Sequence, residues 1–554
     1  MIVQGLTIRD AFKPNTNGGA CVVQNASITI RFCEFSNNHA YRSGAMAVQS
    51  SQISLLHNRF VNNSANNKTG AITIFQSVCD IQNNVFAENE AELDQSCLAL
   101  SSSSGTVEYN RFESNEAFQL GGALSLMGAV PGSWIIRGNE FLFNRASEGA
   151  GLMVGIADSL MILDNLFRGN HAFVDQPPST WGAGGALWIA GCNYAVVSGN
   201  HFVENIADFS GGAIYLANTL DLRNNLFDGN RGRWAGAIEL MNVNQVQPEP
   251  YGSSNIFVRN GPLDPPEDNY AGAIRSTPGT SLTLENCGFL QNTRGAAGWV
   301  AGGYDLSLTD CYWGHPTGPY VPTEHETGLG DTLMRFIDFE PFLSEPVRLP
   351  FMQFSDSTHH FGTVEPGSSA VWTLALANAN EFPLHVHRIA TDTAAFSVAF
   401  TDTLVLQQGD TTTVAVTFAP AEPGEVHGLL LLHSNDAVDT LHTIELIGVG
   451  AGDAVGPAND RSDLPREFRL HPPHPNPFNP SVQFTVALPH PGALRVEVFS
   501  IDGRRTAVLA DGTVRSAGRH RFTFDGRGRA SGTYFVRAAV PGETAQVQKL
   551  LLVR

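Results

Sequence analysis

Residues 112–128 read FESNEAFQLGGALSLMG, and this stretch contains the two short motifs that decide the fold. The first motif is F-x-x-N and the second is G-G-A-[IL]. F-x-x-N occurs ten times, and successive copies are 25 to 35 residues apart. Its phenylalanines are Phe35, Phe60, Phe86, Phe112, Phe141, Phe167, Phe202, Phe227, Phe257 and Phe289. Such self-similarity is typical of repeat architectures.

Each repeat contains short runs of β-branched residues or leucine, separated by Asn and Gly, and these runs are too short for helices. One unit cannot bury its apolar side alone. Stacking the units into a parallel coil solves this, because like residues then lie on like residues about 4.8 Å apart. Phe would form a buried ladder, and Asn would form amide ladders at turns where its backbone tolerates left-handed dihedrals. The sequence therefore predicts a right-handed parallel β-helix over residues 1–345.

The repeats resemble the pectin-lyase-like β-helix superfamily, and the paired GGA[IL] and F-x-x-N signature is similar to the polymorphic outer-membrane adhesins of chlamydiae. The segment that starts CYWGHPTGPY at Cys311 resembles the closing coil of many such bacterial proteins. The chain starts inside an ordinary repeat strand, IVQGLTIRD, without the basic and apolar regions of a signal peptide. We therefore expect the true start to lie upstream.

The cysteines fit the ladder interpretation. Asn usually lies two residues before the repeat Phe, and Cys33 and Cys287 take that place. All seven cysteines fall within residues 1–345, with no CxxC pair. Free thiols in stacked positions are the prediction. A disulfide between Cys287 and Cys311 is the alternative, although ladder spacing matches the Cβ separation of a disulfide poorly.

Residues 351–450 change to alternating strands such as AVWTLALANAN and TTTVAVTFAP, separated by Pro, Gly and Asp turns. This pattern predicts an antiparallel sandwich, similar to the Ig-like modules of bacterial surface proteins. Seven histidines fall here, and His385 and His387 would share one strand face. Scattered, solvated histidines are expected, because no Cys or carboxylate completes a set of metal ligands. A metal site is the alternative.

Residues 451–467 form a polar linker, and residues 468–554 form a second sandwich module. This last module resembles the C-terminal sorting domain of proteins exported by the type IX secretion system. The resemblance is carried by PNPFNP at 475–480, DGR at 502–504, SGTY at 531–534 and the basic end at Arg554. It implies export across an outer membrane and release or anchoring at the surface of a Gram-negative-type bacterium. The predicted fold class is therefore all-β, a right-handed parallel β-helix followed by two Ig-like sandwiches.

Charge and hydropathy exclude several classes of function. The net charge is −20, which disfavours nucleic acid as a partner. The charge is uneven, because residues 468–554 carry +7 and the rest of the chain carries −27. No apolar run approaches the roughly 18 residues of a transmembrane helix.

Catalytic motifs known for this superfamily do not occur in the sequence. The carboxylate sets of polygalacturonases, the R-x-P-x-x-R segment of pectate lyases and the D-P-H-E of alginate epimerases are absent. A lysine base is nearly excluded, since the chain has only Lys13, Lys68 and Lys549. No cofactor is expected, with calcium left open as an alternative.

The repeat register indicates a binding face. With the last residue of GGA as position zero, positions one and three are apolar and point inward, so position two points outward. We name these position-two residues the outer column. From the N-terminal end it reads Val22, Ala47, Thr73, Ala99, Ser125, Met153, Trp188, Tyr215, Glu239 and Arg275. The first half is small, and the second half is aromatic and then charged.

The turn before GGA adds Phe118, Trp181, Phe209, Trp234 and Tyr270 to this face, and two insertions, FVDQPPST and GPLDPPEDNY, enter at the same turn. Exposed aromatic rings stack on sugars, and Glu239 and Arg275 can bond sugar hydroxyls. The sequence therefore suggests a non-catalytic protein, secreted or on the cell surface, that binds an extracellular polysaccharide or cell-surface glycan or that acts in adhesion to other cells. A polysaccharide lyase or glycoside hydrolase, with Glu239 as acid or base, is one alternative. The other is that the aromatics are packing wedges and Glu239–Arg275 is a surface ion pair.

Overall fold

The computed structural model divides the chain into two compact units, residues 1–452 and 453–554, and each is described by itself. The described part of the first unit is 1–92, 96–128, 132–174, 182–216, 220–241, 251–263, 271–276, 282–293, 297–298, 306–322, 324–333, 337–354, 356–380, 382–400, 403–436 and 441–451. The described part of the second is 468–471, 473, 476, 478, 481–490, 492–500, 505–515, 518–527, 529, 532–540 and 546–552. These residues contain strands and turns but no helix.

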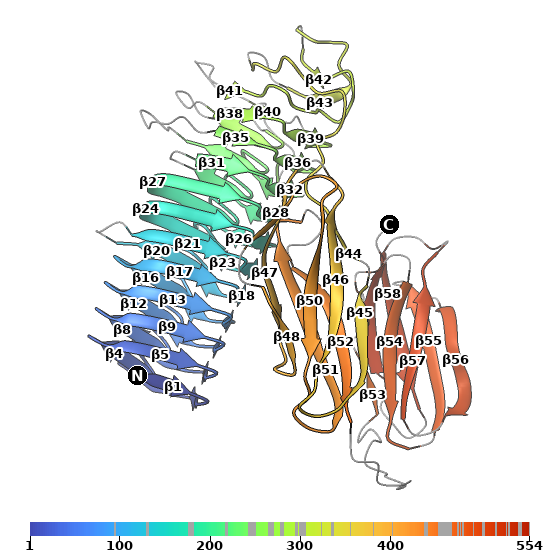
Figure 1. Ribbon diagram of the computed structural model, residues 1–554. Helices are drawn as coiled ribbons and strands as arrows, with labels where there is room; N and C mark the ends of the chain where they lie inside the picture. Colours follow the sequence, from blue (N-terminus) through green and yellow to red (C-terminus); the bar gives the residue numbers. More distant parts are fainter. Residues whose placement is uncertain are drawn as a thin grey trace. The chain divides into compact units, whose positions relative to one another are not determined.

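Residues 1–333 form a parallel β-helix whose coils stack in sequence order (Figure 1). Its largest sheet contains the strands that follow GGA, namely β4 (Cys21–Gln24), β8 (Met46–Gln49), β12 (Ile72–Phe75), β16 (Leu98–Ser101), β20 (Leu124–Met127), β24 (Leu152–Leu163), β27 (Leu187–Ser198), β30 (Ile214–Leu216), β34 (Ile238–Leu240), β37 (Ile274–Ser276) and β40 (Ala297–Gly298). It also contains the strands that lead to F-x-x-N, namely β1 (Ile2–Gln4), β5 (Ser27–Arg31), β9 (Gln52–Leu56), β13 (Val78–Gln82), β17 (Ser104–Glu108), β21 (Ser133–Arg137), β31 (Leu220–Arg223), β35 (Tyr251–Ser253), β38 (Leu282–Glu285) and β41 (Leu306–Ser307). The long strands β24 and β27 span both sets and join them.

Two further parallel sheets complete the coil. The repeat phenylalanines lie in β2 (Thr7–Arg9), β6 (Glu34–Ser36), β10 (Arg59–Val61), β14 (Val85–Ala87), β18 (Arg111–Glu113), β22 (Glu140–Leu142), β25 (Leu166–Arg168), β28 (His201–Val203), β32 (Leu226–Asp228), β36 (Ile256–Val258) and β39 (Gly288–Leu290). The third sheet is β3 (Phe12–Asn17), β7 (His39–Arg42), β11 (Ser64–Ala65), β15 (Glu90–Ala91), β19 (Glu116–Ala117), β23 (Arg145–Ala146), β26 (His171–Ala172), β29 (Ile206–Ala207) and β33 (Arg231–Gly232). β42 (Pro319–Tyr320) and β43 (Gly330–Thr332) pair in the closing segment.

The predicted phenylalanine ladder is confirmed. All ten repeat phenylalanines are buried, and neighbouring ring centroids are 4.6 to 5.0 Å apart. Trp313 of the closing segment stacks on Phe289 at 4.6 Å and ends the ladder. The core of the β-helix is therefore continuous from the first coils to the closing segment.

Two asparagine ladders run beside the phenylalanines. In each, the side-chain Oδ1 accepts from both the backbone N–H and the Nδ2 of the Asn one coil earlier, as in Asn58 with Asn84. One ladder ends at the Cys287 thiol and the other at the Asp331 carboxylate. The expectation of left-handed backbone at these Asn residues is wrong. The left-handed residue is the one just before, such as His57 at φ 56° or Asn83 at φ 56°.

The cysteine prediction is confirmed, because all seven cysteines are free thiols. Cys33 occupies a ladder position, since its backbone N–H donates to Asn58 Oδ1 at 3.0 Å. Burial raises the pKa of the Cys79 thiol to about 12. The Cys79 thiol therefore packs as a small apolar group.

An Ig-like sandwich follows the β-helix. One sheet is β44 (Met352–Phe354), β46 (Ala370–Asn378), β50 (Thr411–Phe418) and β48 (Phe396–Val398). The other is β45 (Thr358–Val364), β52 (Leu441–Gly450), β51 (Gly424–Ser434), β47 (Leu384–Thr391) and β49 (Leu404–Leu406). The pairing is antiparallel except at β45 and β52. That pair is parallel because the chain crosses to the second sheet after β44 and runs along its edge.

The β47 face contacts the β-helix within the first unit. Arg388 donates to Asn83 Oδ1 at 2.8 Å, and its guanidinium carbon lies 4.1 Å from the Tyr109 ring centroid. His387 Nδ1 lies 3.2 Å from Asp164 Oδ2, and only 3% of the His387 side chain is exposed. The expectation of solvated histidines is therefore wrong for His387. It is also wrong for His433, whose pKa burial lowers to about 3.

The second unit is a small antiparallel sandwich. One sheet is β53 (Arg469–Leu470), β54 (Ser481–Leu488) and β57 (Gly518–Asp525). The other is β56 (Arg505–Arg515), β55 (Gly492–Ser500), β58 (Gly532–Ala539) and β59 (Gln546–Leu552). Asn476 and Phe478 of the PNPFNP motif join the last strand, because Asn476 Oδ1 accepts from Leu551 N–H and Phe478 N–H donates to Leu551 O at 2.8 Å. The PNPFNP motif and the last strand, which are far apart in the sequence, therefore meet at the core of this module.

Candidate functional site

The outer column forms one continuous line of paired residues. Met153 pairs with Trp188, Trp188 with Tyr215, Tyr215 with Glu239, and Glu239 with Arg275. The aromatic and charged residues therefore occupy successive coils, as the repeat register predicts. None of the outer-column residues belongs to the central hydrophobic core.

Much of the outer column is covered, although it points away from the core. Ala99, Ser125, Met153 and Glu239 are each at most 3% exposed. Trp188, Tyr215 and Arg275 are half-buried. The expectation of a fully outward face is therefore wrong for these coils. The cover comes from the turn that precedes GGA.

In two coils, a residue of this turn contacts the outer column of the next coil. Ser210, three residues before position zero, donates to Glu239 Oε2 at 2.9 Å. Trp234 is the equivalent residue of the next coil, and the Arg275 guanidinium carbon lies 4.8 Å from its ring centroid. Ser210 and Trp234 thus each contact the outer-column residue of the following coil. We name these turn residues, Leu120, Glu148, Ala183, Ser210 and Trp234, the turn column.

The aromatic and charged parts of the column are arranged differently. The Trp188 and Tyr215 rings are nearly parallel, with an interplanar angle of 2° and centroids 6.4 Å apart. Arg275 Nη1 binds Glu239 Oε1 directly. The predicted Glu239–Arg275 pair is therefore present, but Glu239 is buried rather than on the surface. Trp234 packs between Phe209 and Arg275, as a wedge would.

Glu148 is a residue of this site that the sequence interpretation missed. It pairs with Ala183, which pairs with Ser210, so all three lie in the turn column. Its charge also acts on Tyr215 of the outer column. Glu148 is only 5% exposed. Among the described residues, its carboxylate oxygens do not belong to the buried side-chain atoms that lack a hydrogen-bond partner.

Burial dominates the electrostatics of this site. Desolvation raises the pKa of Glu148 to about 7, with no neighbouring cation to oppose it. Desolvation also raises the pKa of Glu239 to about 7, although Arg275 and Ser210 favour its charged form. Burial, then the charges of Glu239 and Glu148, raise the pKa of Tyr215 to about 12. Tyr215 therefore lies within the electrostatic reach of both carboxylates.

Replacing Glu148 with glutamine should stabilise the protein at alkaline pH. The folded-state pKa of Glu148 lies above its unfolded value, so its favourable contribution is present below about pH 4.3 and is lost as pH rises through about 7. We expect Glu148→Gln to raise the free energy of unfolding by about 2–3 kcal/mol at pH 8 and by almost nothing at pH 4. Denaturant titration at both pH values measures this. Glu116→Gln, at a half-exposed carboxylate, is the control. A Glu148 variant that is less stable at pH 8 would contradict the assignment.

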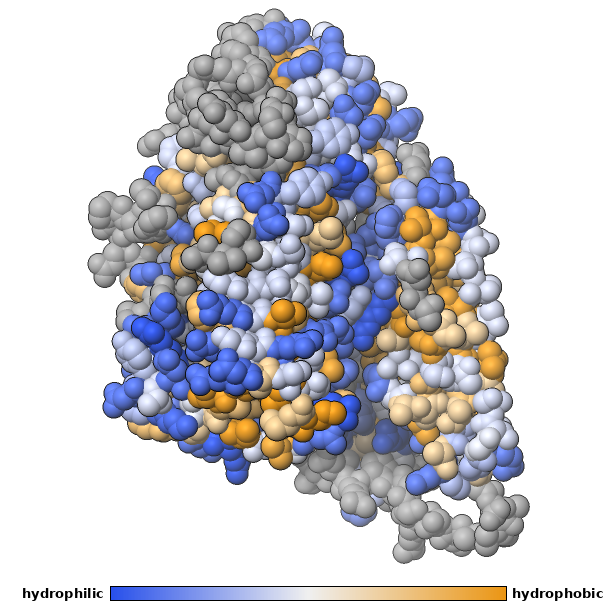
Figure 2. Space-filling model, turned by 60° about the vertical axis from the view of Figure 1, so that its left-hand side comes forward, coloured by the Kyte–Doolittle hydropathy of each residue, from blue (hydrophilic) through white to orange (hydrophobic). Residues whose placement is uncertain are grey.

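Other predicted parts of this face lie outside the described residues. They are Trp181, Tyr270 and residues 175–180 and 264–270 of the two insertions. On the face shown in Figure 2, hydrophobic and hydrophilic side chains alternate in small groups.

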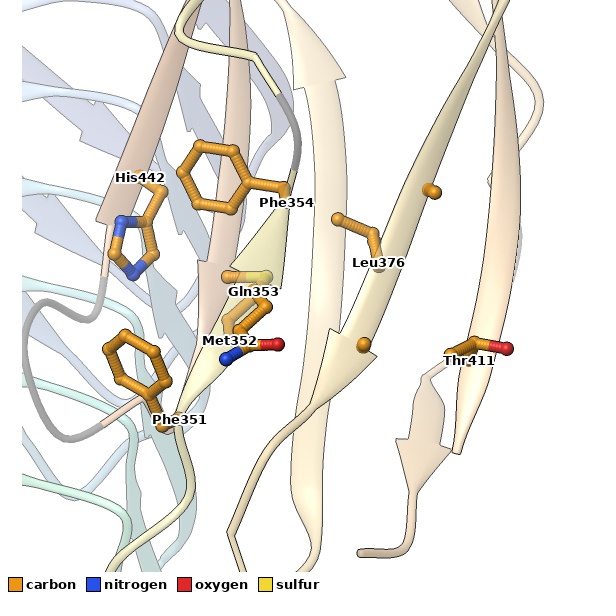
Figure 3. Close-up of a pocket in the computed structure, with 9 residues that line it drawn as sticks. Phe351, Met352, Gln353, Phe354, Leu376, Thr411 and His442 are labelled. Carbon is orange, nitrogen blue, oxygen red and sulfur yellow. The ribbon is translucent and has the colours of Figure 1, made fainter. Parts of the chain in front are cut away.

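A pocket of about 650 Å³ lies elsewhere, in the Ig-like sandwich (Figure 3). It is lined by Phe351, Met352, Gln353, Phe354, Ala375, Leu376, Ala377, Thr411 and His442. His442 Nε2 lies 3.4 Å from Asp436 Oδ1. Gln353, Thr411 and His442 provide the polar side chains of this pocket.

Neither a metal-binding cluster nor a membrane-spanning helix occurs among the described residues. No group of three or more His, Cys, Asp or Glu side chains there could hold a metal ion. No helix there is long and apolar enough to cross a membrane.

Comparisons with known proteins support the fold. The chain matches the family model of the right-handed β-helix region over residues 2–131 and 77–260. Residues 350–440 match ASH, described as "Abnormal spindle-like microcephaly-assoc'd, ASPM-SPD-2-Hydin". The molecule is therefore an all-β protein with a right-handed parallel β-helix and an Ig-like module. No curated protein matches the chain.

Solved structures show only distant likeness. An ASH/PapD-like domain of human CEP192 is 18% identical with a TM-score of 0.16, and the match covers 18% of this chain and 84% of that domain. Secreted serine protease VesC from Vibrio cholerae is 13% identical with a TM-score of 0.17, covering 37% of this chain and 52% of VesC. Dimeric latent PorU from Porphyromonas gingivalis is 17% identical with a TM-score of 0.14, covering 39% of this chain and 22% of PorU. TM-scores this low support no conclusion about function.

Proposed function

We propose that this protein is a secreted or cell-surface β-helix protein that binds a glycan without cleaving it. The observation that carries the proposal is the stacked pair of Trp188 and Tyr215, half-buried in adjacent coils. Paired aromatic rings suit the apolar faces of sugars, and nearby polar groups fix their orientation. The resemblance to pectin-lyase-like proteins and to polymorphic outer-membrane adhesins agrees with an extracellular polysaccharide or cell-surface glycan as the partner.

Alanine at Trp188 or Tyr215 should weaken glycan binding by about 1–2 kcal/mol each, the scale of a buried aromatic contact. Binding of the full chain to a panel of immobilised extracellular polysaccharides, followed by titration with the best ligand, measures the loss. Tyr194→Ala is the matched control, because this exposed tyrosine lies on the same strand, β27. Unchanged binding by both Trp188→Ala and Tyr215→Ala would refute the site.

A polysaccharide lyase or glycosidase is the competing function. The two carboxylates with a raised pKa, Glu148 and Glu239, are what favour it. Glu239 fits such a role poorly, because Ser210 and Arg275 already occupy both of its oxygens. New reducing ends or unsaturated products from the bound polysaccharide would establish the enzyme and displace the binding proposal.

We also propose that residues 468–554 direct export through a type IX secretion system. The support is the ordered set of motifs in this module, together with its net charge of +7 on an otherwise acidic chain. Deleting residues 468–554 should retain the protein inside a type IX-competent host. Cell fractionation with immunoblotting measures this, and the full chain is the control. Equal export of both forms would exclude this route.

A further inference from the structure

A cluster of rings fills the contact between the β-helix and the Ig-like sandwich within the first unit. Centroid to centroid, the Tyr109 ring of the β-helix lies 6.1 Å from the ring of His387, on β47, and 4.8 Å from that of His433, on β51. The two histidine rings are 6.1 Å apart. Arg388 lies over the Tyr109 ring and also binds Asn83. One tyrosine of the β-helix therefore packs with three side chains of the sandwich.

The β-helix backbone makes room for the sandwich at this contact. The left-handed turn position of Tyr109 is glycine in two later coils, at Gly138 and Gly199. A Cβ atom at Gly138 would lie 3.6 Å from His387 Nε2, and one at Gly199 would lie 3.1 Å from the Cβ of Asn435. Longer side chains at these two positions would therefore fill the space that the sandwich occupies.

The imidazole of His387 is buried without hydrogen bonds. Its side chain is 3% exposed, and neither ring nitrogen has a hydrogen-bond partner among the described residues. Asp164 Oδ2 lies 3.2 Å from Nδ1 but does not complete a hydrogen bond. Burial removes the water that would solvate an imidazolium, so it favours the neutral ring.

The charged and titratable groups around His387 and His433 come from both sides of the contact. They are Glu108, Arg137 and Asp164 of the β-helix, and His385 and Arg388 of β47. Two arginines therefore face two carboxylates. Burial raises the pKa of Asp164 to about 7 and also raises the pKa of Glu108. As the pH falls these carboxylates lose their charge, and charged histidines would then meet only the arginines.

A third histidine, His201 of the β-helix, is buried at the same contact and is 5% exposed. The groups that face it are Asp436 and His442 of the sandwich and Arg168 of the β-helix. Burial lowers the pKa of His201 to about 4 and the pKa of His433 to about 3. It also lowers the pKa of His387 well below its ordinary value. All three rings are therefore neutral at neutral pH while the sandwich is docked on the β-helix.

We propose that this contact opens at acidic pH, because acidification charges the buried histidines and releases the Ig-like sandwich from the β-helix. In the released state each ring meets water and titrates at about pH 6.5. The released state therefore binds more protons than the docked state below that pH, and docking weakens as the pH falls. Protonation of Asp164 and Glu108 acts in the opposite direction, and the three histidines outweigh it.

Energy transfer between two fluorescent labels in the full chain measures the release. The labels are attached at Glu90→Cys on the β-helix and Val371→Cys on the sandwich, both exposed positions, with Cys21→Ser because the other native thiols are buried. Between pH 7 and pH 4.5 the equilibrium constant for release should rise at least about a hundredfold. His433→Phe, which keeps a ring that cannot be charged, should reduce this rise by at least about tenfold. His427→Gln, at an exposed histidine on the same strand, should leave the rise unchanged.

Acid unfolding is distinguished from release by circular dichroism, which should show the same β-sheet signal at pH 4.5 and at pH 7. Returning the sample to pH 7 should restore the energy transfer. Constant transfer across the pH range overturns the proposal, and so does a change that coincides with loss of the β-sheet signal. A change that persists in full in both His433→Phe and His387→Phe also overturns it. If neither variant folds, the unaltered histidines decide, because the release constant should then rise at least about tenfold per pH unit at its steepest.

Discussion

Replacing Phe141 with alanine should lower the free energy of unfolding by about 3–5 kcal/mol, which is the cost of removing a fully buried aromatic ring. Phe141 has no exposed surface and stacks between Phe112 at 5.0 Å and Phe167 at 4.6 Å. The backbone of the coils above and below fixes both neighbours, so the cavity cannot collapse. Denaturant titration followed by circular dichroism measures the change.

Phe143 provides the matched control two residues later. Its side chain is 53% exposed, and its backbone is left-handed at φ 54°. Phe143→Ala should therefore cost less than about 1 kcal/mol. If the two variants lost similar stability, the ladder would not be the source of the β-helix's stability.

The ladders could be predicted because each coil repeats its neighbour. Stacking puts like residues in contact, so F-x-x-N alone defines both the buried Phe and one buried Asn. The same reasoning gave the outer column and its order from Trp188 to Arg275. It did not give the burial of Glu239, because the covering side chain comes from the turn of another coil.

Glu148 was missed for a related reason. The turn column does not repeat one residue type, since it reads Leu120, Glu148, Ala183, Ser210 and Trp234. Its side chains act one coil away, and insertions of varying length separate the partners in the sequence. The contact of His387 with Asp164 was missed likewise, because no sequence pattern shows which face of a sandwich docks on a β-helix.

A ladder asparagine should contribute as much to the free energy of unfolding as a ladder phenylalanine. Asn144 is fully buried, and its side chain makes four hydrogen bonds. Its Nδ2 donates to Phe112 O and to Asn170 Oδ1, and its Oδ1 accepts from the backbone N–H and the Nδ2 of Asn115, all at 3.0 Å. Asn144→Ala leaves these partners buried and unpaired, at about 1–3 kcal/mol each in the worst case. We expect a total loss of about 3–5 kcal/mol, measured by denaturant titration.

Two control variants distinguish the ladder from ordinary surface asparagine. Asn62 donates to Asn37 Oδ1 at 2.8 Å on the exposed side of the equivalent turn three coils earlier, so Asn62→Ala should cost less than about 1 kcal/mol. Asp331 ends the second ladder by accepting from Asn292, and an amide oxygen can accept in the same way. Asp331→Asn should therefore be nearly neutral, whereas Asn144→Asp should destabilise, because a carboxylate inside the ladder cannot donate to Asn170. Tolerance of aspartate at position 144 would show that water, and not the amide ladder, satisfies these buried groups.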